Sequence, residues 1–162
     1  MKKLLHITVL LILFTCSNEN PEALWNKAIN MRTENNLKES ITLYNKIISD
    51  YPNHDLSVKS QFQIAEIYLN DIKEYDIAIY EFNTVITNYP DKTEAMNSLF
   101  MIAYIYNNYL NAYSDAIHHY NLFLNSYPNA ELIPSVKYEL KGLEKYQNEI
   151  DSLNNIINKK NL

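Results

Sequence analysis

The chain has 162 residues, of which 47% are apolar and 20% charged, and its net charge is −5. This is enough for one small domain or a few short repeats. Gly142 is the single glycine, which argues against hairpin-rich β structure and against a phosphate-binding loop. Helical structure is therefore favoured by elimination.

The N-terminal segment is predicted to be an export signal. In "MKKLLHITVLLILFTC" two lysines precede an apolar run from Leu4 to Phe14 that is too short to span a bilayer comfortably, and the segment ends in Cys16. It resembles a bacterial lipoprotein signal, which implies removal of residues 1–15, lipidation of Cys16 and a tether over residues 16–20. Thr15 departs from the small residue that is usual before the cysteine. An ordinary secretory signal and an uncleaved anchor are the alternatives.

Charge and cysteine content limit the partners and the source of stability. Removal of residues 1–15 takes away two lysines and no acid, leaving 12 basic and 19 acidic residues and a net charge of −7. This charge disfavours nucleic acid and anionic membrane surfaces as partners. Cys16 is the only cysteine, so the mature body is expected to be stabilised by packing, without an intramolecular disulfide.

A Tyr-Pro pair recurs with a period of 38 residues, at positions 51–52, 89–90 and 127–128. Twelve residues before each proline stands a small residue (Ser40, Ala78 or Ala116), followed by isoleucine and, four positions after the small residue, by an aromatic residue. This spacing predicts a helix with one buried stripe. Proline lacks an amide donor and clashes with the preceding turn, so each such helix is expected to end at its Tyr-Pro pair.

A second set of helices is predicted upstream of the first. The segments "WNKAINM" (25–31), "FQIAEIY" (62–68) and "FMIAYIY" (100–106) share one phase, and stretches rich in Asn, Asp and Ser connect them to the helices that follow. Each pair of helices therefore forms a hairpin. Asp55 and Thr93 are expected to be the N-caps of the next hairpins.

The repeat resembles the tetratricopeptide repeat, and this resemblance implies an all-α fold, an α-solenoid of three helix hairpins over about residues 21–55, 56–93 and 94–131. Departures are the 38-residue period, where 34 is usual, and Gln61 and Ser98 at positions where a large apolar residue is common. The residues that carry the pattern are Ala28, Ala65, Ala103, Ala78, Ala116, Pro52, Pro90 and Pro128.

Residues 132–162 are expected to form an amphipathic helix that caps the last repeat. The alternatives are a degenerate fourth repeat bent near Gln147 and a seam for self-association. The apolar positions that indicate this helix are Val136, Leu140, Leu143, Tyr146, Ile150, Leu153 and Ile157.

No catalytic or metal-binding set is indicated. Asp115 and His119 lie four residues apart and could share one helix face, but a closed metal site needs further ligands. His54 is expected in a turn, His118 beside His119 on a helix, and Glu66, Glu74 and Glu81 on solvated helix faces. The chain is therefore predicted to be no enzyme and to bind no cofactor.

The resemblance implies a protein or peptide partner in the cell envelope, bound in the concave groove that the first helices of the repeats line. It implies a scaffold lipoprotein on the periplasmic face of the outer membrane, similar to those of outer-membrane β-barrel assembly. Ser17, next to Cys16, fits this address. The alternatives are the Tol-Pal cell-division coordinator, a self-associating envelope protein, and a secreted or periplasmic location.

The residues expected to line the groove are aromatic. Trp25, Phe62 and Phe100 each stand three residues before a buried alanine, Tyr138 follows one period later, and Tyr104 is counted with them. They would receive the apolar anchors of a bound peptide. The alternative is that they pack between neighbouring repeats as part of the core.

Overall fold

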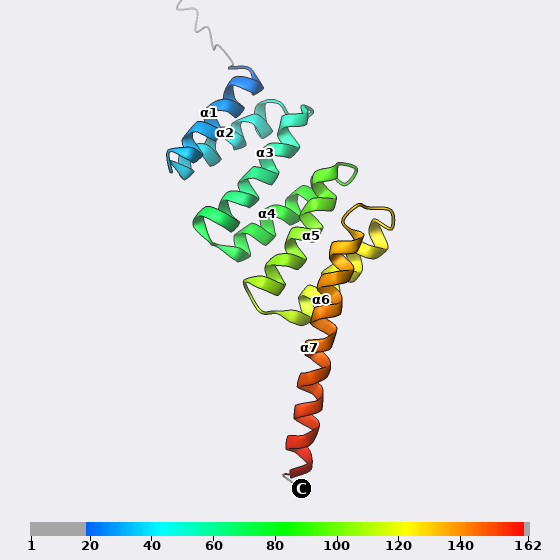
Figure 1. Ribbon diagram of the computed structural model, residues 1–162. Coiled ribbons are helices and arrows are strands. Elements are labelled where there is room, and N and C mark those ends of the chain that lie inside the picture. Colours follow the sequence, from blue (N-terminus) through cyan, green and yellow to red (C-terminus); the bar gives the residue numbers. More distant parts are fainter. Residues whose placement is uncertain (1–18, 161–162) are drawn as a thin grey trace, which may run out of the picture.

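The computed structural model describes residues 19–160, which form a row of antiparallel helix pairs followed by one long helix (Figure 1). The predicted all-α solenoid of three hairpins with a C-terminal capping helix is confirmed. The helices are α1 (Pro21–Thr33), α2 (Leu37–Asp50), α3 (Asp55–Glu66), which continues as a π-helix (Ile67–Ile72), α4 (Tyr75–Asn88), α5 (Thr93–Asn108), α6 (Tyr113–Ser126) and α7 (Ile133–Lys160).

The Tyr-Pro pairs end the second helix of each hairpin, as predicted. Tyr51, Tyr89 and Tyr127 follow the last residues of α2, α4 and α6, and their φ angles are −132°, −135° and −130°. Each tyrosine amide still bonds to the carbonyl four residues before it, at 2.9 Å. The proline that follows has no amide with which to continue the helix.

The turn inside each hairpin repeats with the same period. Asn35, Lys73 and Asn111 have φ angles of 59°, 64° and 53°, in the left-handed region. The second and third hairpins each have one residue more than the first between the buried alanine and this turn. In both, an amide after the turn bonds to the carbonyl six residues before it, Glu74 to Tyr68 at 3.0 Å and Ala112 to Tyr106 at 2.9 Å. The second hairpin contains the π-helix, whereas α5 of the third remains α-helical to Asn108. The sequence did not predict this π-helix.

The predicted N-caps are wrong by one position. Asp55 and Thr93 are the first residues of α3 and α5, and the caps are His54 and Lys92. The Nδ1 atom of His54 accepts a hydrogen bond from the amide of Leu56 at 3.2 Å. The helices begin earlier because the turn after each Tyr-Pro pair closes at once: the amides of His54 and Lys92 already bond to the tyrosine carbonyls.

Small buried residues allow the helices of a hairpin to approach closely. Ala65, Ala78 and Ala103 are fully buried, and the hydroxyl of Ser40 donates to the carbonyl of Ala28 at 2.8 Å. The core runs along the solenoid as three clusters, each combining one hairpin with the first helix of the next unit.

Helix α7 caps the last hairpin with its first half only. Val136, Leu140 and Leu143 are buried against Leu99 and Tyr120, among others, in the third core cluster. The helix is continuous from Ile133 to Lys160, so it is not bent near Gln147 and no second helix of a fourth repeat follows within the described residues. Its second half projects beyond the body of the solenoid (Figure 1).

Candidate protein-interaction groove

A hollow of about 250 Å³ lies across the first helices of the three repeats. Trp25 of α1 and Phe62 of α3 contribute its aromatic walls. Lys59 and Gln63 of α3 and Glu94 and Asn97 of α5 complete the lining. We call this hollow the groove site.

Trp25 and Phe62 are held in place by their own hairpins. The ring of Trp25 meets that of Tyr44 edge to face at 5.2 Å, and the ring of Phe62 meets that of Phe82 at 5.3 Å. Tyr44 and Phe82 are fully buried, whereas Trp25 and Phe62 are half-buried. Each of these two rings therefore packs against the core on one side and lines the hollow on the other. These ring contacts lie within one hairpin, and both side chains also pack against core clusters that join their hairpin to the first helix of the next.

Phe100 and Tyr104 form a separate aromatic cluster. Phe100 packs on Tyr120 at 5.9 Å and on Phe123 at 6.3 Å, and Tyr104 stacks on Phe100 at 6.3 Å. Tyr104 also meets Tyr109 at 6.0 Å. None of these residues lines the groove site.

Tyr138 lies elsewhere, on α7, where 78% of its surface is exposed. It lines a different hollow of about 530 Å³, together with Tyr113 and Tyr146, whose rings meet edge to face at 5.0 Å. Of the predicted aromatic ladder, the structure thus brings Trp25 and Phe62 together and separates them from Phe100, Tyr104 and Tyr138.

A polar network beside the groove site was not predicted. The Nε atom of Arg32 donates to Asp71 at 2.7 Å, and one of its terminal nitrogens donates to Gln63 at 3.0 Å. Because Gln63 lines the groove site, the network fixes a groove residue and joins α1 to the π-helix of the second hairpin. Arg32 and Asp71 are 39 residues apart, so no local pattern indicated the contact.

The two positions that depart from the family pattern are buried. Ser98 is fully buried, and Gln61 is 6% exposed and donates a hydrogen bond to the carboxylate of Glu81. The expectation that Glu81 lies on a solvated face is wrong, because it packs half-buried beside Gln61, and this burial raises the pKa of its carboxyl group. Glu66 is also half-buried, whereas Glu74 is exposed as expected.

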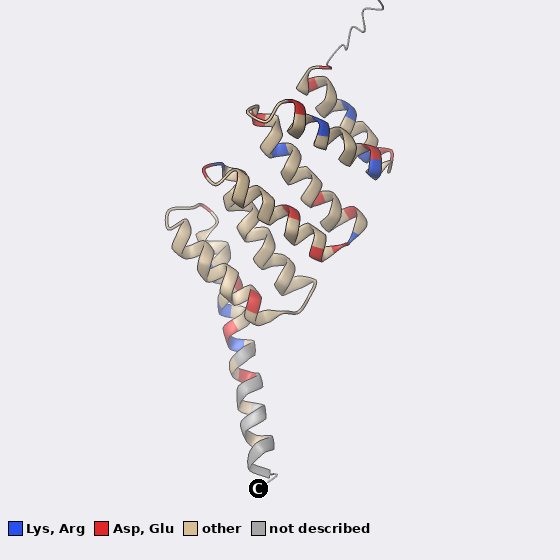
Figure 2. Cartoon of the chain, turned by 180° about the vertical axis from the view of Figure 1, so that it is seen from behind, with Lys and Arg blue, Asp and Glu red and all other residues tan. Residues whose placement is uncertain are grey.

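Charge is distributed unevenly along the solenoid. Asp115 is the only charged residue between positions 95 and 130, and Figure 2 shows α5 and α6 almost without acidic or basic positions. The groove site carries one residue of each sign, Lys59 of α3 and Glu94 of α5, so the formal charges of its lining cancel.

His119 makes its contacts within the fold. Nδ1 of His119 lies 2.8 Å from the carbonyl oxygen of Asp115, and its ring packs against Tyr106 at 5.0 Å. Within residues 19–160, no group of three or more His, Cys, Asp or Glu side chains could hold a metal ion.

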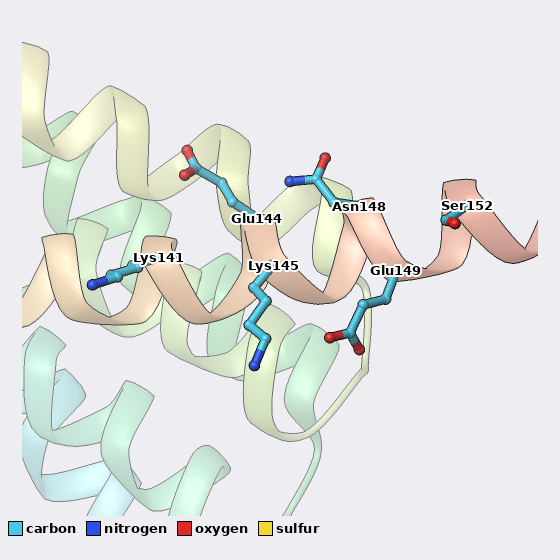
Figure 3. Close-up of a pocket in the computed structure, with 6 residues that line it drawn as sticks. All are labelled: Lys141, Glu144, Lys145, Asn148, Glu149 and Ser152. Carbon is cyan, nitrogen blue, oxygen red and sulfur yellow. The ribbon is translucent and has the colours of Figure 1, made fainter.

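A further depression lies along the exposed side of α7. It measures about 650 Å³, and the described residues that line it all belong to that helix (Figure 3): Lys141, Glu144, Lys145, Asn148, Glu149 and Ser152. A depression lined by one helix is an open surface, and we do not assign it to the groove. In the part of the chain that the structure describes, no helix has both the length and the apolar character to cross a bilayer.

Comparison with known proteins identifies the class. The tetratricopeptide repeat model matches residues 22–54, 59–92 and 97–130, so the chain belongs to the tetratricopeptide repeat family. Similar solved structures are MamA AMB-1 (TM-score 0.56, 16% identity, 86% of this chain and 70% of that chain) and a point mutant of MamA (TM-score 0.56, 16% identity, 83% and 68%). These likenesses show the fold alone. No curated protein matches the sequence. The fold and family are those of a protein–protein interaction scaffold.

Proposed function

We propose that the chain is a non-catalytic scaffold that binds a segment of a partner protein at the groove site. The observation that carries the proposal is the arrangement of Trp25 and Phe62, which come from successive hairpins and meet at one hollow between α1, α3 and α5. Half-buried aromatic side chains on a rigid base are favoured anchors for a partner, because they cover a large area and lose little conformational entropy on binding.

The lining of the groove site indicates the kind of segment it accepts. An apolar side chain fits between Trp25 and Phe62. The amide side chain of Asn97 offers hydrogen bonds to the backbone of the segment, and Lys59 and Glu94 offer one charge of each sign for its orientation. A peptide with one apolar anchor flanked by polar residues meets these demands.

The location that we propose is the cell envelope. The basic and apolar segment before Cys16 supports export and lipidation, and Ser17 supports the periplasmic face of the outer membrane. Residues 1–18 lie outside the described part of the chain. A role in outer-membrane protein assembly is the proposal that follows from this address, and an adaptor of the Tol-Pal type is the alternative.

Filling the groove site tests the binding proposal. Asn97→Trp places a large ring in the hollow without removing a core residue, and it should abolish partner capture by the full chain in the native envelope. Asn121→Trp, at an exposed position of α6 outside the site, is the matched control and should leave capture unchanged. Equal capture by both variants would contradict the proposed binding site.

Metabolic labelling with a fatty-acid analogue tests the proposed tether. The wild type should be labelled, and Cys16→Ser should not be. Equal labelling of the two proteins would show that Cys16 is not the acylated residue. Labelling reports on Cys16 whether or not a partner is bound, and Cys16 is not among the described residues that line the groove site, so the result of this test does not depend on the groove-site test.

A further inference from the structure

Helix α7 occupies the position of a first helix whose hairpin partner is missing. Leu140 and Leu143 pack into the third hairpin as α3 and α5 pack into the hairpins before them. Tyr138 stands one period after Phe100. Phe100 is covered by two aromatic rings of α6, whereas Tyr138 is 78% exposed. One helix-sized face of α7 is thus uncovered.

Residues on this face follow a spacing that suits pairing of two helices. They alternate at intervals of four and three residues and are all exposed, and they are Tyr138, Gly142, Lys145, Glu149, Ser152 and Ile156. This interval places the six residues on one side of the helix, as the contact positions of paired helices are placed, but only the tyrosine and isoleucine at the two ends have the large apolar side chains of a coiled-coil seam. Lys145 and Glu149 extend to the same side of the helix (Figure 3). We call these residues the α7 stripe.

The α7 stripe is complementary to itself when reversed. In an antiparallel pair centred on position 147, Tyr138 faces Ile156 of the second helix, Gly142 faces Ser152, and Lys145 faces Glu149. Each contact then occurs twice, as a two-fold axis requires. A parallel pair would instead oppose lysine to lysine and glutamate to glutamate.

We propose that two copies of this chain associate through the α7 stripes, with the helices antiparallel. Each α7 then supplies the second helix that the incomplete fourth repeat of the other copy lacks. The hairpins of the solenoid are themselves antiparallel helix pairs, so the arrangement continues their packing.

Gly142 supports a close approach of the two helices where it faces Ser152 of the second copy. It is the only glycine of the chain and lies in the interior of α7, where glycine destabilises a helix. A β-carbon at this position would have no atom within 4 Å to meet, so nothing in the described chain requires a glycine. When Ser152 of a second helix lies opposite Gly142, the two small residues allow the helix backbones to approach closely, which explains the glycine at this position.

The length of α7 supports the same conclusion. Among the side chains that the structure describes, Leu143 is the last one of α7 that is buried against the third hairpin, and the helix continues to Lys160. A helical segment of this length has little stability in water without tertiary contacts. A second helix on the stripe would supply these contacts and would close the open depression of about 650 Å³ beside Lys145 and Glu149.

Charge exchange tests this proposal. In sedimentation equilibrium of the full chain in a density-matched detergent, the wild type should dimerise, and Lys145→Glu and Glu149→Lys should each weaken the dimer about tenfold or more. An equimolar mixture of the two variants should recover the wild-type affinity, because each supplies the charge that the other needs. Lys137→Glu, exposed on α7 outside both the stripe and the depression, is the matched control and should dimerise as the wild type does.

Several outcomes would overturn the proposal. A wild type that stays monomeric at about 100 μM, where even weak specific dimers assemble, would show that the face is not covered by a second copy. Single variants that dimerise as tightly as the wild type, or a mixture that does not recover, would show that the stripe is not the seam. Far-ultraviolet circular dichroism confirms that each variant is folded. Asn97→Trp should dimerise normally, so this test is independent of the groove site.

Discussion

The guanidinium group of Arg32 donates a hydrogen bond to the carboxylate of Asp71 at 2.7 Å and thereby joins the first hairpin to the second. The side chains are 24% and 32% exposed, so the ion pair is only partly screened by solvent. Arg32 lies in α1 and Asp71 in the π-helix that follows α3. The contact therefore sets the two helices that carry Trp25 and Phe62 relative to each other.

Loss of this ion pair should weaken the fold measurably. Arg32→Ala is expected to lower the free energy of unfolding by about 0.5–1 kcal/mol, because the pair is partly exposed. A double-mutant cycle with Asp71→Asn, measured by urea unfolding, isolates the interaction. Lys46→Ala is the control, since its nearest carboxylate, on Asp50 of the same helix, is 3.8 Å away. A coupling energy of zero between Arg32 and Asp71 would contradict this role.

The repeating local features were predictable from the sequence. Proline cannot continue a helix, because it lacks an amide donor and clashes with the preceding turn. Buried alanines mark the places where helices cross. Pro52, Pro90 and the alanine positions of the repeat therefore defined the hairpins. The π-helix was not predictable, because the second and third hairpins have the same length between the buried alanine and the turn, yet α3 continues as a π-helix whereas α5 remains α-helical to Asn108. Contacts of the solenoid as a whole decide between these outcomes.

The aromatic residues were harder to place than the helices. Phe100 and Tyr138 are in phase in the sequence, yet only Phe100 has a second helix beside it. A period predicts which side of a helix a residue occupies, but not whether another helix covers that side. The contact between Arg32 and Asp71 could not be predicted either, because two residues that are far apart in the sequence leave no local pattern.

Enlarging the buried alanines should destabilise the solenoid. Ala65→Leu and Ala103→Leu are each expected to cost about 1–3 kcal/mol, since both sites are fully buried between helices and cannot accept three more carbon atoms. Ala23→Leu makes the same change at an exposed position of α1 and should leave the thermal melt nearly unchanged. Equal melting temperatures for all three variants would show that the repeat register is wrong.

Phe100 and Tyr138 should respond differently to truncation. Phe100→Ala removes a half-buried ring from three aromatic neighbours and should lower the free energy of unfolding by about 2–3 kcal/mol, below the value for a fully buried ring. Tyr138→Ala, at a site that is 78% exposed, should change the free energy of unfolding of the monomer very little. Chemical denaturation at low protein concentration measures both, and equal losses would contradict the assigned burial.

The half-buried carboxyl group of Glu81 should make stability depend on pH. Burial raises its pKa above the ordinary value of 4.5, although the hydrogen bond from Gln61 acts in the opposite direction. The folded chain therefore binds this proton more tightly than the unfolded chain, and ionisation of Glu81 disfavours folding. This unfavourable contribution is absent below the unfolded pKa and complete above the folded pKa.

Replacing Glu81 should remove that contribution. Glu81→Gln is expected to raise the free energy of unfolding at pH 7 relative to the wild type, and the difference should vanish as the pH falls below 4.5. Glu74→Gln changes an exposed acid and serves as the control. Urea unfolding measured from pH 7 to below pH 4.5 tests this prediction. A Glu81→Gln variant that is less stable than the wild type at pH 7 would contradict it.

Site-specific photocrosslinking tests the central claim, that a partner protein binds at the groove site, most directly. A photoreactive amino acid replaces Lys59, which lines the groove site, or Lys38, which is exposed on α2 outside it, in the full chain produced in its native envelope. We predict a covalent adduct with a second protein from position 59 and none from position 38. An adduct of equal yield from both positions, or from position 38 alone, would contradict the claim.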